Sequence, residues 1–453
     1  MKQLILICSI LFKSNLIFSQ SIPSDYFSYQ SKKIFYDTGI DWNSLTIFGP
    51  IRFDLKKQDQ IIKREPSLYF DGMINCNIGN NVYALSGFGH FKYKNHFYGY
   101  VYPSLINKTS NNLQFGVENN LSNNDNNYAG LGFENSWVIL QVGKGKESWG
   151  AGEDIELALS DNSKPYNYFL LGSDYGKVRV RYIYGFLENV ERNINRYLTA
   201  RGFEWTNKKS IIIGVSETVI YSGENRSFDI GYLNPISTHL ENELNNRLNI
   251  LGDNNSNAVW QLHLDFLLNN NFRFSLNYLL DEFVIDPNIE IGKEHGEAYS
   301  IRIAYTPFYS STHHFTLIGS IIYVGTPTFR HGNGTNNFVH KNIPLGWERG
   351  SDTQEFNFGF NYFNNKNIVV KILSGYYEMG EESIVNRVFD PYSDYLKGTY
   401  PSGNVSSEFY FKSFYSYFWN DNSFSLMLWL NWSQNKGSEM QLGFQVPFNF
   451  LLN

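Results

Sequence analysis

Apolar and polar side chains alternate with a period of two residues along most of this chain. In WQLHLDFLL (260–268), Leu262, Leu264 and Phe266 alternate with polar residues, and NFRFSLNYLL (271–280) repeats the pattern. Successive side chains of a β-strand point to opposite faces, so each segment predicts a strand with one apolar and one polar face. The same alternation marks GKVRVRYIYG, EAYSIRIAY, EFNFGFNYF, SFSLMLWLNW and SEMQLGFQVPFNF.

The predicted strands are long, and their connections differ in length. They run about nine to eleven residues, enough for a tilted strand to cross a bilayer, whereas strands of a soluble β-sandwich, the alternative fold, average about five or six. The connection Leu267–Phe272 is short, and Gly325–Gly350 is long and polar. We therefore predict an all-β fold: a transmembrane antiparallel β-barrel of about 18 strands with long extracellular loops, some of them folding into the lumen.

The N-terminal residues predict an exported protein. Lys2 precedes an apolar run, Leu4–Phe18, and Ser19 is a small residue at which a signal peptidase can cut. This run contains Lys13 and is too short for a membrane helix, which needs about 20 apolar residues. We expect residues 1–19 to be a signal peptide, 20–66 an N-terminal periplasmic or plug element, and 67–453 the barrel.

Composition narrows the class of protein. Aromatic residues make up 17% of the chain and charged residues 18%, with a net charge of −6, and no basic stripe predicts nucleic-acid binding. After the N-terminal run no apolar segment is long enough for a membrane helix, so a chain of this kind must cross a membrane as a closed β-barrel. Cys76 is the only cysteine outside the predicted signal peptide, so the predicted fold depends on backbone pairing and packing.

A glycine-rich stretch, GKGKESWGAGEDIELALSDNSKP (143–165), carries the most distinctive motif. A phosphate-binding loop would need G-x-x-x-x-G-K-[ST] or G-x-G-x-x-G between a strand and a helix, and neither spacing is present. Instead, SWGAG with Trp149, Gly150 and Gly152 follows a strand that ends in WVILQVGKG, and LSDNSKP closes the stretch. This order resembles a signature of the capsule-assembly Wzi family of outer-membrane barrels.

Three later segments are similar to the same family, in the same order. They are GYLNPISTHLENE (231–243) before a strand that carries Asp265, FVHKNIPLGWERGSDTQEFNF (338–358) and YYEMGEESI (376–384). The lysine-rich GKGKES and the residues before Ser67 depart from the family pattern. The resemblance therefore covers most of the predicted barrel but not the N-terminal element.

The resemblance implies an outer-membrane lectin of a Gram-negative bacterium, which binds capsular or other exported polysaccharide and anchors it at the cell surface during capsule assembly. Contact with outer-membrane lipid is implied with it. The last predicted strand, Met440–Phe450, ends in aromatic residues and suits pairing by the barrel-assembly machinery. We expect a monomer without a cofactor. The alternative is a passive porin or transport channel for small solutes.

Sugars are bound by aromatic faces and by amide, carboxylate and guanidinium groups, which the loop Thr326–Asp352 supplies. Other roles stay open for these residues, because Asn and Gly form turns, Trp347 suits an interfacial aromatic belt, and Trp149 suits a packed turn at the barrel mouth. The candidate saccharide-binding residues are Trp149, Arg330, Asn336, Trp347, Arg349 and Asp352.

The polar faces of the predicted strands are expected to line the lumen, with Arg179, Arg181, His263, Asp265, Arg273 and Arg302. In a channel these charges would create a transverse field, whereas in a plugged barrel they would pair with one another and with an inserted loop. No histidine lies beside a nucleophile motif, and His313-His314 has no partner at ligand spacing, so we expect neither an enzyme nor a metal site. We expect Leu264→Arg to block membrane assembly and His263→Arg to be tolerated.

Overall fold

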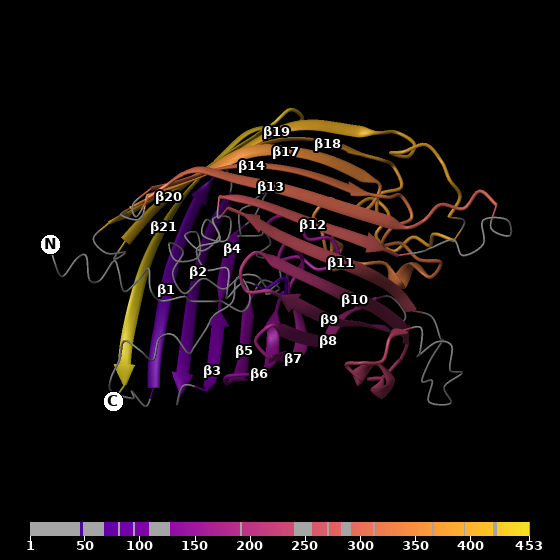
Figure 1. Cartoon of the computed structure of the whole chain (residues 1–453), viewed down its shortest axis with the longest axis horizontal. Coiled ribbons are helices and arrows are strands. Elements are labelled where there is room, and N and C mark those ends of the chain that lie inside the picture. The colour runs from indigo at the N-terminus through magenta and orange to yellow at the C-terminus, as the bar shows by residue number, and fades with distance from the viewer. Residues whose placement is uncertain are drawn as a thin grey trace.

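The computed structural model describes most of the chain (Figure 1). The predicted signal peptide and nearly all of the predicted N-terminal element lie outside the described residues. Within the described part of the chain, no helix has the length and apolarity needed to cross a membrane. The described residues are 46–48, 68–79, 82–93, 96–107, 127–190, 193–239, 256–269, 271–281, 291–310, 313–364, 367–393, 395–419 and 424–452.

Strands dominate the described residues, as the alternation predicts. Two short 3-10 helices are η5 (Ile230–Leu233) and η6 (Gly334–Asn336). The first strands are β1 (Leu68–Gly79), β2 (Val82–Tyr93), β3 (Phe97–Tyr102), β4 (Ser104–Asn107), β5 (Tyr128–Glu134), β6 (Val138–Gly145), β7 (Tyr166–Asp174), β8 (Val178–Val190), β9 (Ile194–Thr206), β10 (Ile211–Glu224) and β11 (Ser256–Leu268). The later ones are β12 (Phe272–Leu280), β13 (Glu297–Tyr309), β14 (His313–Val324), β15 (Val339–His340), β16 (Ile343–Pro344), β17 (Thr353–Asn364), β18 (Ile368–Met379), β19 (Ser406–Trp419), β20 (Phe424–Ser433) and β21 (Gly437–Leu452).

One antiparallel sheet of 19 strands closes on itself. Most strands pair with the next along the chain. There are two exceptions: β3 pairs with β5 and not with β4, and β14 passes the separate β15–β16 hairpin and pairs with β17. Strand β21 pairs with β1 from Leu68↔Leu452 to Gly79↔Gln441, and Figure 1 shows the yellow β21 beside the indigo β1. Because β3 and β4 both pair with β2 and are separated only by Pro103, they form one crossing, and the 19 strands make 18 crossings.

The long connections all lie at one end of the barrel. Neighbouring strands alternate in direction, so the loops that follow β4, β6, β10, β12, β14 and β18 lie at the same end, here called the loop end. Short turns such as 175–177, 207–210 and 269–271 lie at the opposite end, here called the turn end. The start of β1 and the end of β21 also lie at the turn end. This arrangement is typical of outer-membrane barrels, which have short periplasmic turns and long extracellular loops.

The two faces of the wall differ as the period of two predicts. In β12, Arg273, Ser275 and Asn277 are buried and face inward, and the residues between them are more exposed. Apolar side chains are exposed on the outward faces, as a lipid-facing wall requires. Examples from around the barrel are Val142, Phe203, Val215, Leu262, Ile303, Phe358 and Leu430. The structure confirms the predicted fold class.

The largest apolar core lies inside the barrel. It joins inward side chains of the wall to segments that enter the lumen, and its members include Phe48, Trp149, Leu157, Leu345 and Trp347. These residues belong to the N-terminal region, the β6–β7 loop and the β14–β17 loop. Loops of the loop end therefore fold into the lumen.

Two glycines of the wall leave room for residues 46–48. A Cβ on Gly202 would lie 2.3 Å from the Phe48 ring, and one on Gly214 would lie 2.0 Å from Ile47. The Ile47 backbone N–H donates to the inward Glu204 carboxylate at 2.7 Å. Residues 46–48 are the described part of the predicted 20–66 element, whose assignment as a periplasmic or plug element stays a prediction.

Candidate functional site

The β6–β7 loop enters the barrel as the inner segment, residues 147–160. Trp149 is 1% exposed, its backbone N–H donates to the Leu159 carbonyl at 3.1 Å, and its indole N–H donates to Glu147 at 3.0 Å. The Phe48 ring meets the indole edge-on, with centroids 4.9 Å apart. In this structure Trp149 therefore packs the inner segment and presents no free ring face.

Inward amide and hydroxyl groups of the wall hold the backbone of the inner segment. The Asn277 side chain accepts from the Ala151 N–H and donates to the Ala151 carbonyl, both at 2.8 Å. The Ser300 hydroxyl donates to the Ile155 carbonyl at 2.7 Å. A segment without secondary structure can enter a barrel only if its backbone groups find partners, and the polar face of the wall supplies them.

The predicted lumen residues lie on inward faces and have protein partners. Arg273 and Asp265 are both fully buried and form an ion pair, with Nε donating to Oδ1 at 2.7 Å. His263 contacts the Ser216 hydroxyl and the Asn277 amide oxygen, each at 2.9 Å. Three further pairs join an inward arginine to a carboxylate: Arg179–Glu204 at 2.5 Å, Arg181–Glu147 at 3.6 Å and Arg302–Glu153 at 4.0 Å. Glu147 and Glu153 belong to the inner segment, so these charges bind the wall to the inserted loop.

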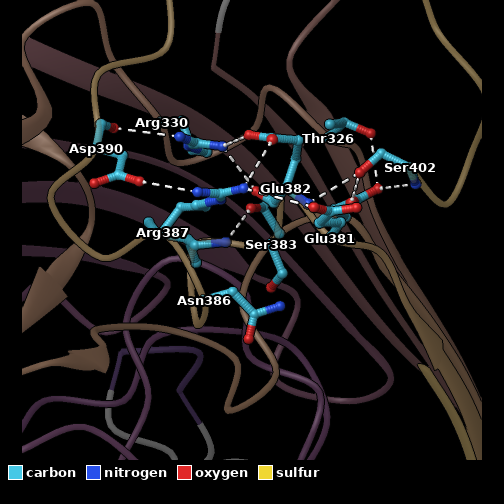
Figure 2. A network of polar contacts seen from close by, with 12 residues as sticks. Thr326, Arg330, Glu381, Glu382, Ser383, Asn386, Arg387, Asp390 and Ser402 are labelled. Carbon is cyan, nitrogen blue, oxygen red and sulfur yellow. Dashed lines mark hydrogen bonds and ion pairs between the residues drawn. The ribbon is translucent and has the colours of Figure 1, made fainter. Parts of the chain in front are cut away.

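The β14–β17 loop is held by two of the candidate saccharide residues (Figure 2). The buried Arg330 donates to the Glu382 carboxylate at 2.7 Å and to its carbonyl at 2.8 Å, and its guanidinium lies 4.7 Å from the centre of the Tyr392 ring. The buried Asn336 accepts from the Ser222 hydroxyl of β10 at 2.7 Å. Both residues connect this loop to other elements.

Trp347 and Asp352 have similar roles in the same loop. The Trp347 N–H donates to the carbonyl of Leu157 in the inner segment at 3.1 Å, and its side chain is buried inside the barrel. The buried Asp352 carboxylate accepts from the Thr326 hydroxyl at 2.8 Å and from the Ser402 N–H at 3.0 Å. An interfacial belt position for Trp347 does not agree with its place in the inner core.

Arg349 is surrounded by acidic and aromatic side chains. It forms an ion pair with Glu355 of β17, and its Nη2 is 3.7 Å from Glu348. Its guanidinium lies 3.7 Å from the centre of the Tyr377 ring. All six candidate residues thus join loops to each other or to the wall, and saccharide contact at these positions stays a prediction.

Sequence reasoning missed an exposed group on the β18–β19 loop. This charged rim consists of Glu381, Glu382, Arg387 and Asp390 (Figure 2). Arg387 lies 3.7 Å from each glutamate and 3.6 Å from the aspartate, and all four side chains are between 37% and 59% exposed. The ion pairs of Arg387 are long and solvated and therefore weak, so Arg387 can exchange them for hydroxyl groups of a ligand. The sequence EESIVNRVFD (381–390), in which acidic residues stand on both sides of an arginine, could have indicated this group.

Aromatic side chains lie beside the charged rim. The rings of Tyr392 and Tyr395 meet edge-on with centroids 5.4 Å apart. Burial raises the pKa of Tyr392, so its hydroxyl stays protonated at neutral pH and can donate a hydrogen bond. The loop end thus combines carboxylates, a guanidinium and aromatic rings. Among the residues that the structure describes, no group of three or more His, Cys, Asp or Glu could hold a metal ion.

Solved outer-membrane proteins share this architecture. The chain is similar to Wzi, an outer membrane protein involved in group 1 capsule assembly in Escherichia coli and a carbohydrate-binding β-barrel, with a TM-score of 0.64 and 11% identity over 96% of this chain and 99% of that chain. Pseudomonas aeruginosa OprD gives a TM-score of 0.47 and 10% identity over 85% and 96%. OccK2 from the same bacterium, in complex with glucuronate, gives 0.46 and 9% over 85% and 99%. No family model and no curated protein matches the chain.

The closed sheet, the faces of its wall and the likeness to Wzi define the fold: a β-barrel of the kind found in outer-membrane proteins. At 11% identity this likeness concerns the fold.

Proposed function

We propose that the barrel is a lectin-like protein that binds capsular or other exported polysaccharide at its loop end and anchors it at the surface of a Gram-negative cell. The observation that carries the proposal is the inner segment, whose Ala151, Leu157 and Leu159 are fully buried inside the barrel. A filled interior suits a rigid binding platform better than a passage for solutes. The solved barrel with the same fold, Wzi, is described as carbohydrate binding.

The pairing of the inward charges supports the platform over the passive channel. Charges that act in a channel face water along its path. Here Arg273 is fully buried against Asp265, and Arg302 faces Glu153 of the inner segment. These contacts favour a plugged lumen over an open channel.

The charged rim and the neighbouring tyrosines are the proposed contact surface. Glu381, Glu382 and Asp390 can accept hydrogen bonds from sugar hydroxyls, and Arg387 can donate to them or pair with the carboxylates of an acidic saccharide. Arg330 donates to Glu382, so the loop that carries the charged rim is bonded to the β14–β17 loop. No catalytic group is part of the proposal.

Biogenesis follows the same proposal. We expect the chain to be exported with residues 1–19 as its signal peptide, to be inserted by the barrel-assembly machinery, and to act as a monomer without a cofactor. Size measurement of the mature protein extracted from membranes tests the cleavage and the oligomeric state together. A mature mass that still includes residues 1–19, or a stable oligomer, would contradict this part.

Polysaccharide retention tests the function. Purified barrel in vesicles is sedimented with extracellular polysaccharide from an encapsulated Gram-negative strain, and the bound sugar is assayed. We expect Arg387→Ala to lower retention several-fold, whereas Lys209→Ala, which removes one positive charge from the turn end, leaves retention unchanged. Unchanged retention in Arg387→Ala would remove the charged rim from the proposal, and no retention by the parent protein would overturn the lectin function for that polysaccharide.

Single-channel recording separates the alternative. In planar bilayers we expect the parent barrel to be silent, because the buried inner segment occupies the lumen. Steady openings together with absent polysaccharide retention would support the passive porin instead.

A further inference from the structure

The described residues of the loop after β10 do not fold into the barrel but over its outside. We call its described residues 226–239 the outer flap. On β10, Ile220 and Ser222 face inward, because Ile220 belongs to the inner core and Ser222 bonds Asn336. Tyr221 lies between them and must face outward. Tyr221 stacks on Tyr232 of the flap, with centroids 4.3 Å apart and an interplanar angle of 12°.

The outer flap is bound to the outward faces of β8 to β11. The hydroxyl of Tyr182 on β8 donates to the Tyr232 carbonyl at 2.6 Å. Arg201 on β9 donates to the Asn234 carbonyl at 3.2 Å. The His239 N–H donates to Glu217 on β10 at 3.1 Å. In Figure 1, η5 of the flap lies at the edge of the β8–β10 wall.

An ion pair on the outward face lies beneath this flap. Arg201 Nε is 3.2 Å from Glu217, and the two residues face each other in the β9–β10 register. Although both are on the outer side of the barrel, they are only 8% and 3% exposed. A charged side chain that faces acyl chains destabilises a membrane barrel, most strongly near the midplane of the bilayer. The flap separates this pair from the surroundings of the barrel.

The flap's own exposed surface is mainly apolar, with Ser227 and Asn234 as its exposed polar residues. Ile236 is 85% exposed and Ile230 is 76% exposed, and Phe228 and Leu233 are exposed as well. Its charged residues turn toward the wall: Arg226 is buried with its guanidinium 4.5 Å from the centre of the Tyr221 ring. A loop in water shows the opposite distribution, with charges outside and apolar groups inside.

These apolar side chains continue the lipid-facing band of the wall. On β10 the exposed outward residues are Ile213 and Val215, and the next outward residue is the covered Glu217. With the half-buried Ile211 in the same phase, three outward positions extend the apolar face by about 14 Å along the strand, whereas the apolar band of an outer-membrane barrel is about 25 Å tall. The wall in this sector therefore lacks the upper part of its band, and the flap lies where that part belongs.

We propose that the outer flap is part of the lipid-facing surface, with Ile230 and Ile236 in contact with acyl chains of the outer leaflet. The proposal rests on the membrane-spanning barrel and not on polysaccharide binding. It assigns a lipid surface, rather than a second copy of the chain, as the partner of this apolar patch, because the next outward residues beside the covered Arg201 and Glu217 are the exposed Phe203 and Val215 of the lipid-facing band.

Site-specific fluorescence quenching tests this. In a full chain with Cys8 and Cys76 replaced by serine, Ile230→Cys and Ile236→Cys are labelled with an environment-sensitive fluorophore. Val215→Cys on the wall is the lipid-facing control, and Asn386→Cys on the β18–β19 loop is the water-facing control. Each variant is reconstituted in phosphatidylcholine vesicles that contain nitroxide-labelled acyl chains, and heat-modifiable migration checks that each barrel is folded.

We expect quenching at positions 230 and 236 to equal that at 215 and to exceed that at 386 several-fold. Quenching at the level of 386, with strong quenching by aqueous iodide, would overturn the proposal and place the flap in water. Protection from both quenchers, with disulfide-linked dimers formed by Ile236→Cys, would overturn it as well and make this face an interface between copies.

Discussion

The inner segment and the outer flap cover opposite faces of the same barrel wall, and their chemistry is opposite too. Inside, the wall supplies polar groups: Asn277 and Ser300 bond the backbone of the inner segment, whose apolar side chains are buried and whose Glu147 and Glu153 face wall arginines. Outside, the wall supplies tyrosine rings and the Arg201–Glu217 pair, and the flap supplies backbone carbonyls and a stacked ring.

The difference follows from the solvent on each side. Inside a barrel, water can replace a missing protein partner, so the inward polar side chains of the wall could stay hydrated without the inserted segment. What the inserted segment adds is packing and rigidity. Outside, no water reaches the hydrocarbon region, so a charged pair on that face needs a complete cover. The inner segment should therefore matter through packing, and the outer flap through the charges that it covers.

The largest expected effect is the loss of packing inside the barrel. Trp149→Ala removes a fully enclosed aromatic side chain and should lower the free energy of unfolding by about 3–5 kcal/mol. Urea titration followed by heat-modifiable gel migration measures this. Polysaccharide retention should fall only as far as the barrel unfolds.

Gly152→Val should also lower the free energy of unfolding. Gly152 has a φ of +86°, and a Cβ there would lie 2.8 Å from Ile155. A Trp149→Ala barrel of unchanged stability that has lost polysaccharide retention would show that the indole is a sugar platform and would reverse the comparison.

The next largest effect is expected from the Arg201–Glu217 ion pair beneath the outer flap. Arg201→Met removes the guanidinium from the buried Glu217 carboxylate, which keeps its contacts to His239, at a cost of about 3 kcal/mol. Replacing both residues by methionine should restore most of the stability, because an apolar pair of similar volume suits a face next to lipid. The same urea titration in vesicles compares the single and double variants. A double variant that is as unstable as the single one would show that the flap needs the charges for its own attachment.

The sequence predicts the wall well because its faces follow a local rule. The period of two places Arg273, Ser275 and Asn277 together, and the structure has all three buried on one side of β12. The Arg201–Glu217 pair breaks that rule. On β9, Arg201 lies on the same face as the apolar Phe203 and Trp205, and on β10, Glu217 lies on the same face as Ile213 and Val215. Two opposite charges in apolar phase on neighbouring strands indicate a covered outer face.

The loops could not be predicted in this way. Whether a loop folds inward or outward depends on contacts between residues far apart in the chain, such as Arg330 with Glu382 and Asp352 with Ser402. The residue types of the candidate site suit sugar binding and suit loop anchoring equally well. Only the packing shows that Arg330 and Asp352 are buried while Arg387 is exposed.

Charge on the lipid-facing side of β11 gives a depth-dependent effect. Leu264→Arg, near the middle of the strand, should cost about 2–3 kcal/mol, whereas Leu268→Arg at the turn end should cost less than about 1 kcal/mol, because its guanidinium can reach water. Folding yield into vesicles and urea titration measure both. Equal costs at the two depths would mean that this face does not cross the bilayer as assigned.

The expected tolerance of His263→Arg needs revision on the same strand. His263 is fully buried between Ser216 and Asn277, so a longer charged side chain has no room there. Leu268 is therefore the better control for Leu264.

The smallest effect concerns the outward surface of the flap. An isoleucine at the centre of a bilayer contributes about 0.3–0.6 kcal/mol, so the double variant Ile230→Ser/Ile236→Ser should lower the stability of the vesicle-inserted barrel by about 1 kcal/mol. Asn386→Ser, on a loop exposed to water, should leave it unchanged. Both are compared by urea titration in phosphatidylcholine vesicles. A double variant that matches or exceeds the parent would mean that the flap faces water, and the Arg201–Glu217 pair would then be covered against water rather than against lipid.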